Sequence, residues 1–494
     1  MMKSVLKTVV CQTALLGLTL GSALSAQALS IDWSGTYRFE YTEVDKTSLD
    51  DPSLRKAYFL NHLSLSPKII AADGVNIVGK FEILPNDQYP DSQAGQPFGR
   101  GPTKAGTTSS TKDDSAVAGD KQGSSTLKVQ QLYLTVNQEY GMLVAGRAPL
   151  DFGLGISHSA GNGAFDHWYS TRDMVGYKFL IGNFSFMPIM GKVYDQSVSQ
   201  GEEAQDVIWH VDYTNPETES SIGVMHQSRT ASPEANDAPA SQYSSTGVVA
   251  GRWNTQLISI YLARGFEDVK FKVEAGFESG STGVQVGNTN TEEISLNGYG
   301  IAVELDFPNP QSRWHWNLKT GIASGDNPTT TNYEGFHFHR NYDVAFLLFN
   351  HPLGRYDIMR SYAQRGPDRT NCVTAPCAPY STDTALDDES ISNALYVSPK
   401  AVYNINDKWD WTNRITWAQL QTNPLANSND ALNVDVAKDL GFEWDTGVVF
   451  RPHERIQWVN ELGLLFPGAA WKAGSRDYGN SFTYGFSSKA AISF

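Results

Sequence analysis

The stretch "DVKFKVEAGFES" (268–279) alternates almost strictly between apolar and charged residues. Its apolar positions are Val269, Phe271, Val273, Ala275 and Phe277. Its charged positions are Asp268, Lys270, Lys272, Glu274 and Glu278. A period of two is typical of a β-strand whose faces meet different environments. In a soluble sandwich the apolar face would be core, whereas in an outer-membrane barrel it would face lipid.

The same alternation recurs along the chain and favours the barrel. It is found in "IDWSGTYRFEYT" (31–42), in "DLGFEWDTGVVFR" (439–451) and in the last residues, "SFTYGFSSKAAISF" (481–494). Aromatic residues gather near segment ends, as in the interfacial girdles of membrane barrels. They are Trp33, Tyr41, Trp314, Trp316, Trp409, Trp411, Trp417, Trp444 and Trp458. A sandwich would also need protected sheet edges, so we predict an all-β transmembrane antiparallel barrel.

The chain contains about 18 strand-like runs, and bacterial single-chain barrels have an even number of strands. The runs begin near Ile31, Ala57, Val75, Leu127, Met142, Met174, Phe184, Asp206, Ser220, Thr255, Asp268, Ile294, Ser312, Asn393, Lys408, Asp439, Arg455 and Ser481. Short turns such as "ADG" (72–74) alternate with long polar segments, which lie near 85–126 and 325–391. We expect short periplasmic turns, long extracellular loops, and a last strand that ends beside the first.

The N-terminal residues 1–28 have the features of a secretory signal peptide. Lys3 and Lys7 precede an apolar run, and Ala26-Gln27-Ala28 forms a cleavage pattern before Leu29. The predicted barrel domain is therefore 29–494, integral to the outer membrane of a Gram-negative cell. In an exported chain, Cys372 and Cys377 of "NCVTAPCAPY" (371–380) are expected to form a disulfide.

Several function classes are disfavoured by the sequence. The formal charge of −15 argues against nucleic acid as a partner. The stretch "GISHSAG" (155–161) lacks the G-x-S-x-G frame of a nucleophile elbow, and no ligand spacing matches a dedicated calcium loop. We expect no catalytic site, no cofactor and no metal site.

The inward parity of the strands carries charges of both signs, and a barrel of this size encloses a lumen too wide for side chains to fill. The predicted pore-lining residues are Arg38, Glu40, Lys80, Glu82, Arg147, Lys178, Lys270, Lys272, Glu274, Glu278, Glu304, Arg313, Lys319, Arg414, Glu443, Asp445, Arg455 and Glu461. Rings of charge can select solutes. The alternative is that these charges only hydrate the lumen and pair across strands.

A passive channel for hydrophilic solutes is the function that these features favour. The alternatives are a structural or adhesive barrel plugged by its own loops and, with less support, an outer-membrane hydrolase. The expected partners are outer-membrane lipid and lipopolysaccharide, the barrel assembly machinery and a small hydrophilic solute. We expect a monomer.

Three stretches resemble the alginate-export type of outer-membrane barrel. They are "VAGRAPLDFGLGI" (144–156), "LKTGIASGDNP" (318–328) and "LGFEWDTGVVFRPHERIQWVNELGLLFPGAAW" (440–471). The resemblance covers the strands and not the loops. It implies an eighteen-stranded monomeric pore that passes an anionic polysaccharide, with Arg147, Asp326, Glu443 and Asp445 at matching motif positions. The pore of that family is dominated by basic residues, whereas the lumen predicted here is mixed in charge, so the resemblance implies architecture and passage rather than alginate itself.

Overall fold

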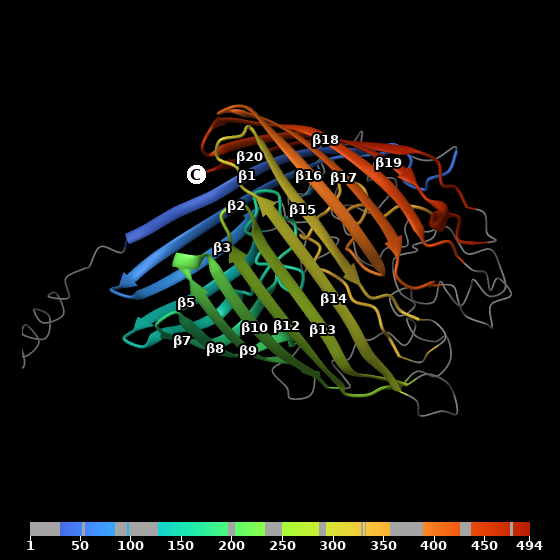
Figure 1. Cartoon of the computed structure of the whole chain (residues 1–494). Coiled ribbons are helices and arrows are strands. Elements are labelled where there is room, and N and C mark those ends of the chain that lie inside the picture. The colour runs from blue at the N-terminus through green and yellow to red at the C-terminus, as the bar shows by residue number, and fades with distance from the viewer. Residues whose placement is uncertain are drawn as a thin grey trace, which may run out of the picture.

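The computed structural model describes residues 30–51, 55–83, 96–97, 127–195, 203–232, 249–285, 293–327, 330, 332–355, 389–424, 436–474 and 478–494. Within these ranges one antiparallel sheet closes on itself, and β1 pairs with β20 (Figure 1). Its long strands are β1 (Ser30–Val44), β2 (Lys56–Ala72), β3 (Val75–Ile83), β5 (Lys128–Gln138), β6 (Gly141–Pro149), β7 (Thr171–Ile181), β8 (Phe184–Asp195), β9 (Glu203–Asn215), β10 (Ser220–Ala231), β12 (Trp253–Gly265), β13 (Lys270–Gln285), β14 (Glu293–Phe307), β15 (Trp314–Ala323), β16 (Ala394–Asn406), β17 (Trp409–Leu420), β18 (Asp439–His453), β19 (Ile456–Pro467) and β20 (Thr483–Ser493).

The eighteen-strand antiparallel barrel predicted from the sequence is therefore confirmed. Each long strand begins within three residues of its expected start. Four short elements complete the described part of the chain: β4 (Gln96–Pro97), β11 (Val249–Ala250), and the 3₁₀ helices η1 (Pro216–Thr218) and η4 (Ala469–Lys472). Among the residues that the structure describes, no helix has the length and apolarity needed to span a bilayer.

The two ends of the barrel differ in their connections. At the short-turn end, two-residue turns such as 73–74 and 182–183 join neighbouring strands. At the long-loop end, β6 is joined to β7 through residues 150–170, and β15 to β16 through residues 324–393. Each long strand therefore runs once from one end of the barrel to the other, and the longer connections all lie at the same end.

The barrel closes where the last strand meets the first. The backbone N–H of Gly35 donates to the carbonyl of Phe494 at 3.0 Å, and the N–H of Phe494 donates to the carbonyl of Gly35 at 3.0 Å. Tyr37 lies opposite Ile492 in the same ladder. Because every long strand has two neighbours, no long strand presents an open edge.

The outer face of the barrel is apolar and exposed, and aromatic residues lie near both ends of the strands. Trp33 is 61% exposed, Trp316 54% and Trp458 47%, all near the short-turn end, while Trp417 and Trp444 lie near the long-loop end. This surface is the opposite of what a soluble fold would show, because large apolar side chains on such a face need lipid around them.

The buried apolar residues lie inside the barrel, on two loops that fold back into the lumen and on the inward face of the strands that they contact. The first inner loop is residues 150–170, and the second inner loop is residues 332–355. One cluster combines residues of both inner loops with the wall, including Ile156, Phe338, Phe346 and Tyr396. A second cluster packs Phe152 of the first inner loop against β6–β10.

Candidate functional site

The first inner loop is held to the barrel wall by one carboxylate. Glu274 of β13, which is fully buried, accepts the backbone N–H groups of Leu154 at 2.6 Å, Ile156 at 3.2 Å and Ser157 at 3.2 Å. The Ser157 hydroxyl donates to the same carboxylate at 2.7 Å. A carboxylate that accepts several N–H groups replaces the water that both partners lose on burial.

The opposite end of the first inner loop contacts β1. The guanidinium of Arg38 donates to the carbonyl of Asp166 at 2.7 Å, and its Nε lies 2.5 Å from the carboxylate of Glu40. His167 Nε2 lies 2.8 Å from the same carboxylate, which accepts a hydrogen bond when that nitrogen carries the proton. Lys80 of β3 lies 4.2 Å from the ring centre of Tyr169. The loop is thus fixed at both ends by charged wall residues.

The second inner loop is anchored by β18. Glu443 accepts the backbone N–H groups of Phe346 at 3.0 Å, Leu347 at 2.6 Å and Leu348 at 2.7 Å. Asp445, two residues further along the same face, accepts the N–H of Phe346 at 3.2 Å. A short loop segment therefore donates its otherwise unpaired N–H groups to two buried carboxylates.

Two glycines in the wall make room for the second inner loop. Gly463 of β19 and Gly485 of β20 lie opposite each other and face the lumen. A Cβ at Gly463 would lie 2.7 Å from the ring of Phe346, and one at Gly485 would lie 2.6 Å from it. Both distances are well inside van der Waals contact, so the Phe346 ring occupies space that larger wall residues would fill.

The two inner loops also contact each other. The side chain of Asn341 accepts the N–H of Trp168 at 3.1 Å and donates to the carbonyl of Trp168 at 2.7 Å. The N–H of His339 donates to the carbonyl of Ile156 at 2.7 Å, and the Arg340 guanidinium lies 4.1 Å from the ring centre of Trp168. The loops therefore form one internal obstruction, fixed to the wall on β1, β13 and β18.

An open cavity of about 500 Å³ lies against β13–β17 toward the short-turn end. Its inward-facing charged residues are Lys272, Glu304, Asp306, Lys319, Lys400 and Arg414. Lys272 pairs with Asp306 at 3.1 Å, and Lys319 pairs with Glu304 at 2.9 Å. Within the described part of the chain, neither Lys400 nor Arg414 has a carboxylate at ion-pair distance.

Most of the predicted pore-lining residues lie on the inward face of their strands. Several of them lie on continuous cross-strand rows of that face or directly beside such a row. They are Lys270, Lys272, Glu304, Lys319, Arg414, Glu443, Asp445 and Glu461. Lys270 pairs with Glu219 at 2.7 Å, and Glu82 contacts His62 at 3.2 Å. Lys178 lies opposite inward-facing Met142. An inward-facing side chain does not always line open water. Six of the predicted pore-lining residues face inward but are buried: Arg38, Glu40, Glu82, Glu274, Glu443 and Asp445.

The inward placement predicted for Arg147 is wrong. Arg147 lies opposite Leu132 and Asp173, and it is on the outer wall with them. Alternation gave no signal here, because the inward face of β6 is also apolar: Val144 and Ala148 pack on the first inner loop.

Two further residues predicted to line the pore lie outside the strands. Arg313 and Arg455 are exposed residues of the turns that precede β15 and β19, at the short-turn end. The predicted strand starts were two residues and one residue too early at these positions, and that placed both arginines in the wall. Cys372 and Cys377 lie outside the described residues, so their disulfide stays a prediction.

Some candidate residues were missed at the sequence level. Lys400 could have been found, because it follows Ser398 on the inward parity of β16. Asp206 of β9, which is 1% exposed, contacts Arg172 and Arg229 at 2.8 Å each. That cluster joins strands β7, β9 and β10, and no local motif identifies it.

Three histidines of the inner loops favour the neutral form: His158 and His351, which are buried, and His339, which is largely buried. Burial, reinforced by Arg172 and Arg229, lowers the pKa of His158 to about 3. Burial, reinforced by Arg340, lowers the pKa of His339 to about 4. Burial also holds the pKa of His351 well below its usual range, and Lys56 and Lys489 add to this. Docking therefore disfavours protonation of these three histidines.

Among the residues that the structure describes, no group of three or more His, Cys, Asp or Glu residues could hold a metal ion.

Comparisons with known proteins support the fold. No protein-family model matches the chain, and no curated protein matches its sequence. The structure is similar to OccK9 (OpdG) of Pseudomonas aeruginosa, with a TM-score of 0.50, 11% identity, and coverage of 94% of this chain and 98% of that one. At this identity the similarity supports a porin-type barrel fold alone.

Two other similar structures have lower scores. The outer membrane protein opdK of Pseudomonas aeruginosa has a TM-score of 0.48, with 9% identity over 94% of this chain and 98% of that one. The outer membrane channel DcaP of Acinetobacter baumannii has a TM-score of 0.41, with 12% identity over 95% of this chain and 99% of that one. The similarity to these two structures is weaker than the similarity to OccK9. None of the three similar structures supports membership of the alginate-export family in particular.

Proposed function

We propose that the chain forms a channel for hydrophilic solutes in the outer membrane of a Gram-negative bacterium, and that it prefers anions. The proposed anion preference rests on two neighbouring cations, Lys400 and Arg414. These cations lie side by side in register and face the cavity near the short-turn end.

The charge balance around this cavity supports the preference. The carboxylates of Glu304 and Asp306 are paired with lysines. Asp445 lies opposite Arg414 in register, and Asp445 and Glu461 offset part of the positive charge of Lys400 and Arg414. The two cations sit between low-dielectric walls, where their field acts on a passing solute.

Reversal of these two charges tests the proposal. In a planar bilayer with a salt gradient, the double variant Lys400→Glu, Arg414→Glu should move the reversal potential from anion preference toward cation preference. The shift should be larger at low salt, where the Debye length exceeds the roughly 8 Å of physiological salt. Arg264→Glu is the matched control, because Arg264 is exposed on the outer wall near the short-turn end. An unchanged reversal potential in the double variant would reject the anion preference.

A structural barrel closed by its own loops is the second candidate. It is favoured by the apolar packing between the inner loops and the wall, where Leu347 and Leu348 are fully buried. A purified protein that carries no current, even after its inner loops are loosened, would support this reading. The same sample can be assayed for lipid or peptide hydrolysis, which the hydrolase alternative requires.

The identity of the solute needs a separate screen. The resemblance to alginate exporters makes an anionic polysaccharide one candidate, and small organic acids are another. Liposome-swelling rates for neutral sugars, uronic acid oligomers, organic acids and amino acids would rank them. Faster entry of acids than of neutral sugars of equal size is the expected result.

A further inference from the structure

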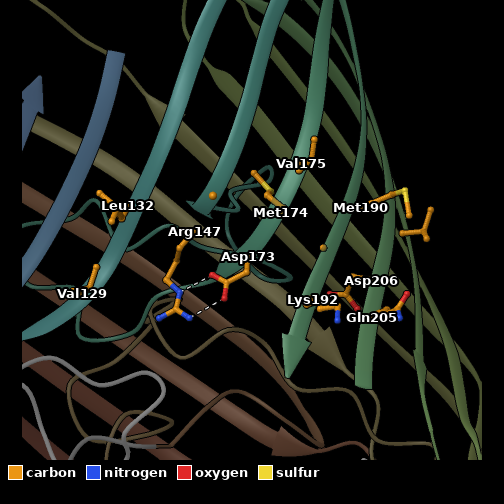
Figure 2. Close-up of a pocket in the computed structure, with 13 residues that line it drawn as sticks. Val129, Leu132, Arg147, Asp173, Met174, Val175, Met190, Lys192, Gln205 and Asp206 are labelled. Atoms are coloured by element: carbon orange, nitrogen blue, oxygen red, sulfur yellow. Dashed lines mark hydrogen bonds and ion pairs between the residues drawn. The ribbon is translucent and has the colours of Figure 1, made fainter. Parts of the chain in front are cut away.

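A row of polar side chains crosses the outer wall of the barrel near the long-loop end. The row consists of one residue from each of four neighbouring strands, each opposite the next: Arg147 on β6, Asp173 on β7, Lys192 on β8 and Gln205 on β9. Arg147 and Asp173 form a bidentate ion pair at 2.7 and 2.9 Å, and their side chains are 48% and 54% exposed (Figure 2). This polar row is unusual on a wall whose other outward residues are mainly apolar.

An apolar row runs parallel to the polar row, two residues closer to the short-turn end. Val175, Met190 and Val207 lie opposite one another and are 57%, 68% and 37% exposed. Together with Leu132 and Val129 of β5, they line an open groove of about 650 Å³ that the polar row borders. At about 3.3 Å per residue, the two rows are about 7 Å apart along the strands.

The level of these rows in the membrane follows from the strands. The polar row lies within three residues of the long-loop ends of β6, β7 and β9. On the far wall, the outward residues near the same end include Trp417, Trp444 and Phe466, which mark the interface. Charged side chains cost little at this depth, where lipid headgroups lie, and apolar side chains just below them meet acyl chains.

We propose that this groove binds a phosphorylated glycolipid of the outer leaflet. Its acyl chain lies over Val175, Met190 and Val207, and its phosphate contacts the polar row at Arg147 and Lys192. The row presents two cations, Arg147 and Lys192, at the depth of an anionic headgroup. Guanidinium groups suit phosphate geometry, and Asp173 fixes the position of the Arg147 guanidinium at the wall.

This occupant fits better than a second copy of the chain. The central parts of protein interfaces are depleted of charged residues, whereas this groove is bordered by a half-exposed ion pair. The lipid site lies outside the lumen, so it goes beyond the proposed channel; it rests on the proposed outer-membrane location and does not require that the lumen conducts.

Binding of purified lipid A to the delipidated full-length protein tests the proposal. Native mass spectrometry in detergent would follow retention of lipid A, with phosphatidylethanolamine as the comparison lipid. The double variant Arg147→Glu, Lys192→Glu should weaken lipid A binding about tenfold, which corresponds to about 1.4 kcal/mol. Arg264→Glu makes the same kind of charge change on the outer wall near the other end of the barrel, and it should leave binding unchanged.

A second variant tests the apolar part of the groove. Val175→Trp fills it without a change of charge, and it should also reduce retention of lipid A. This variant keeps the test valid if the charge reversal prevents folding, which heat-modifiable migration on gels would reveal. The proposal is overturned if lipid A binds equally to all variants, if phosphatidylethanolamine binds as tightly, or if the groove is covered by a second copy in an oligomer that the variants disperse.

Discussion

Glu274 shows how a single wall residue controls the lumen. Its carboxylate accepts four donors from the first inner loop, three from the backbone and one from the Ser157 hydroxyl. The same residue, considered only as part of an alternating strand, was expected to face water. The structure instead gives it a docking role, because loop N–H groups need acceptors once they leave solvent.

Substitution of Glu274 by Gln should loosen the first inner loop. An amide offers one acceptor oxygen and turns two donors toward the loop N–H groups, and a hydrogen bond to a charged group contributes about 1.5–3 kcal/mol. Hydrogen–deuterium exchange should therefore quicken by about tenfold or more at Leu154, Ile156 and Ser157. Glu278→Gln is the matched control, four residues along the same face. Equal exchange in both variants would remove the docking role of Glu274.

At the scale of the element, the inner loops combine buried charge with buried histidine. His158 and His339 have pKa values of about 3 and about 4 in the docked loops, below the usual histidine pKa of about 6.5. An undocked loop binds protons below pH about 6.5, whereas a docked loop does not. The stability that these two histidines contribute to docking is therefore complete above that pH and is lost as pH falls toward 4.

Protonation of these two histidines should accordingly loosen the inner loops on acidification. Single-channel conductance should rise between pH about 7 and about 4.5, and the double variant His158→Gln, His339→Gln should respond less. Exchange of the inner-loop amides over the same range provides a second readout. A conductance that falls on acidification, or a variant that responds as the natural chain does, would contradict the linkage.

Substitutions in β13 test which of its faces meets lipid and which faces the lumen. Val273→Lys would place a charge on the lipid face and should cost roughly 2–4 kcal/mol near the midplane of the membrane. Lys272→Glu, on the lumen face, should leave folding efficiency in lipid vesicles near that of the natural chain. If Lys272→Glu blocks assembly while Val273→Lys is tolerated, the two faces are reversed.

The predicted disulfide between Cys372 and Cys377 should affect one loop only. Closing so short a loop between Cys372 and Cys377 should contribute on the order of 2 kcal/mol, because the entropic gain grows with loop length. It should shape the loop and leave the unfolding of the barrel nearly unchanged. Alkylation of both thiols in the absence of reductant would show that the bond does not form.

For the molecule as a whole, the wall could be predicted from the sequence and the lumen could not. Period-two alternation decides strand starts and faces, since each strand has one lipid face. It failed at Arg147, where the inward face is also apolar because it packs on an inner loop. The docking of Phe346 against Gly463 and Gly485 joins residues more than a hundred positions apart, and no local pattern in the sequence encodes it.

Planar-bilayer recording is the most direct test of a conducting barrel narrowed by its own loops. The natural protein should give small, anion-preferring steps. Gly485→Val, whose new side chain would overlap Phe346 and displace the second inner loop, should give larger steps, and so should Glu274→Gln. Absence of current in all three proteins, with the barrel shown to be folded, would contradict the channel and leave a structural barrel as the account of this fold.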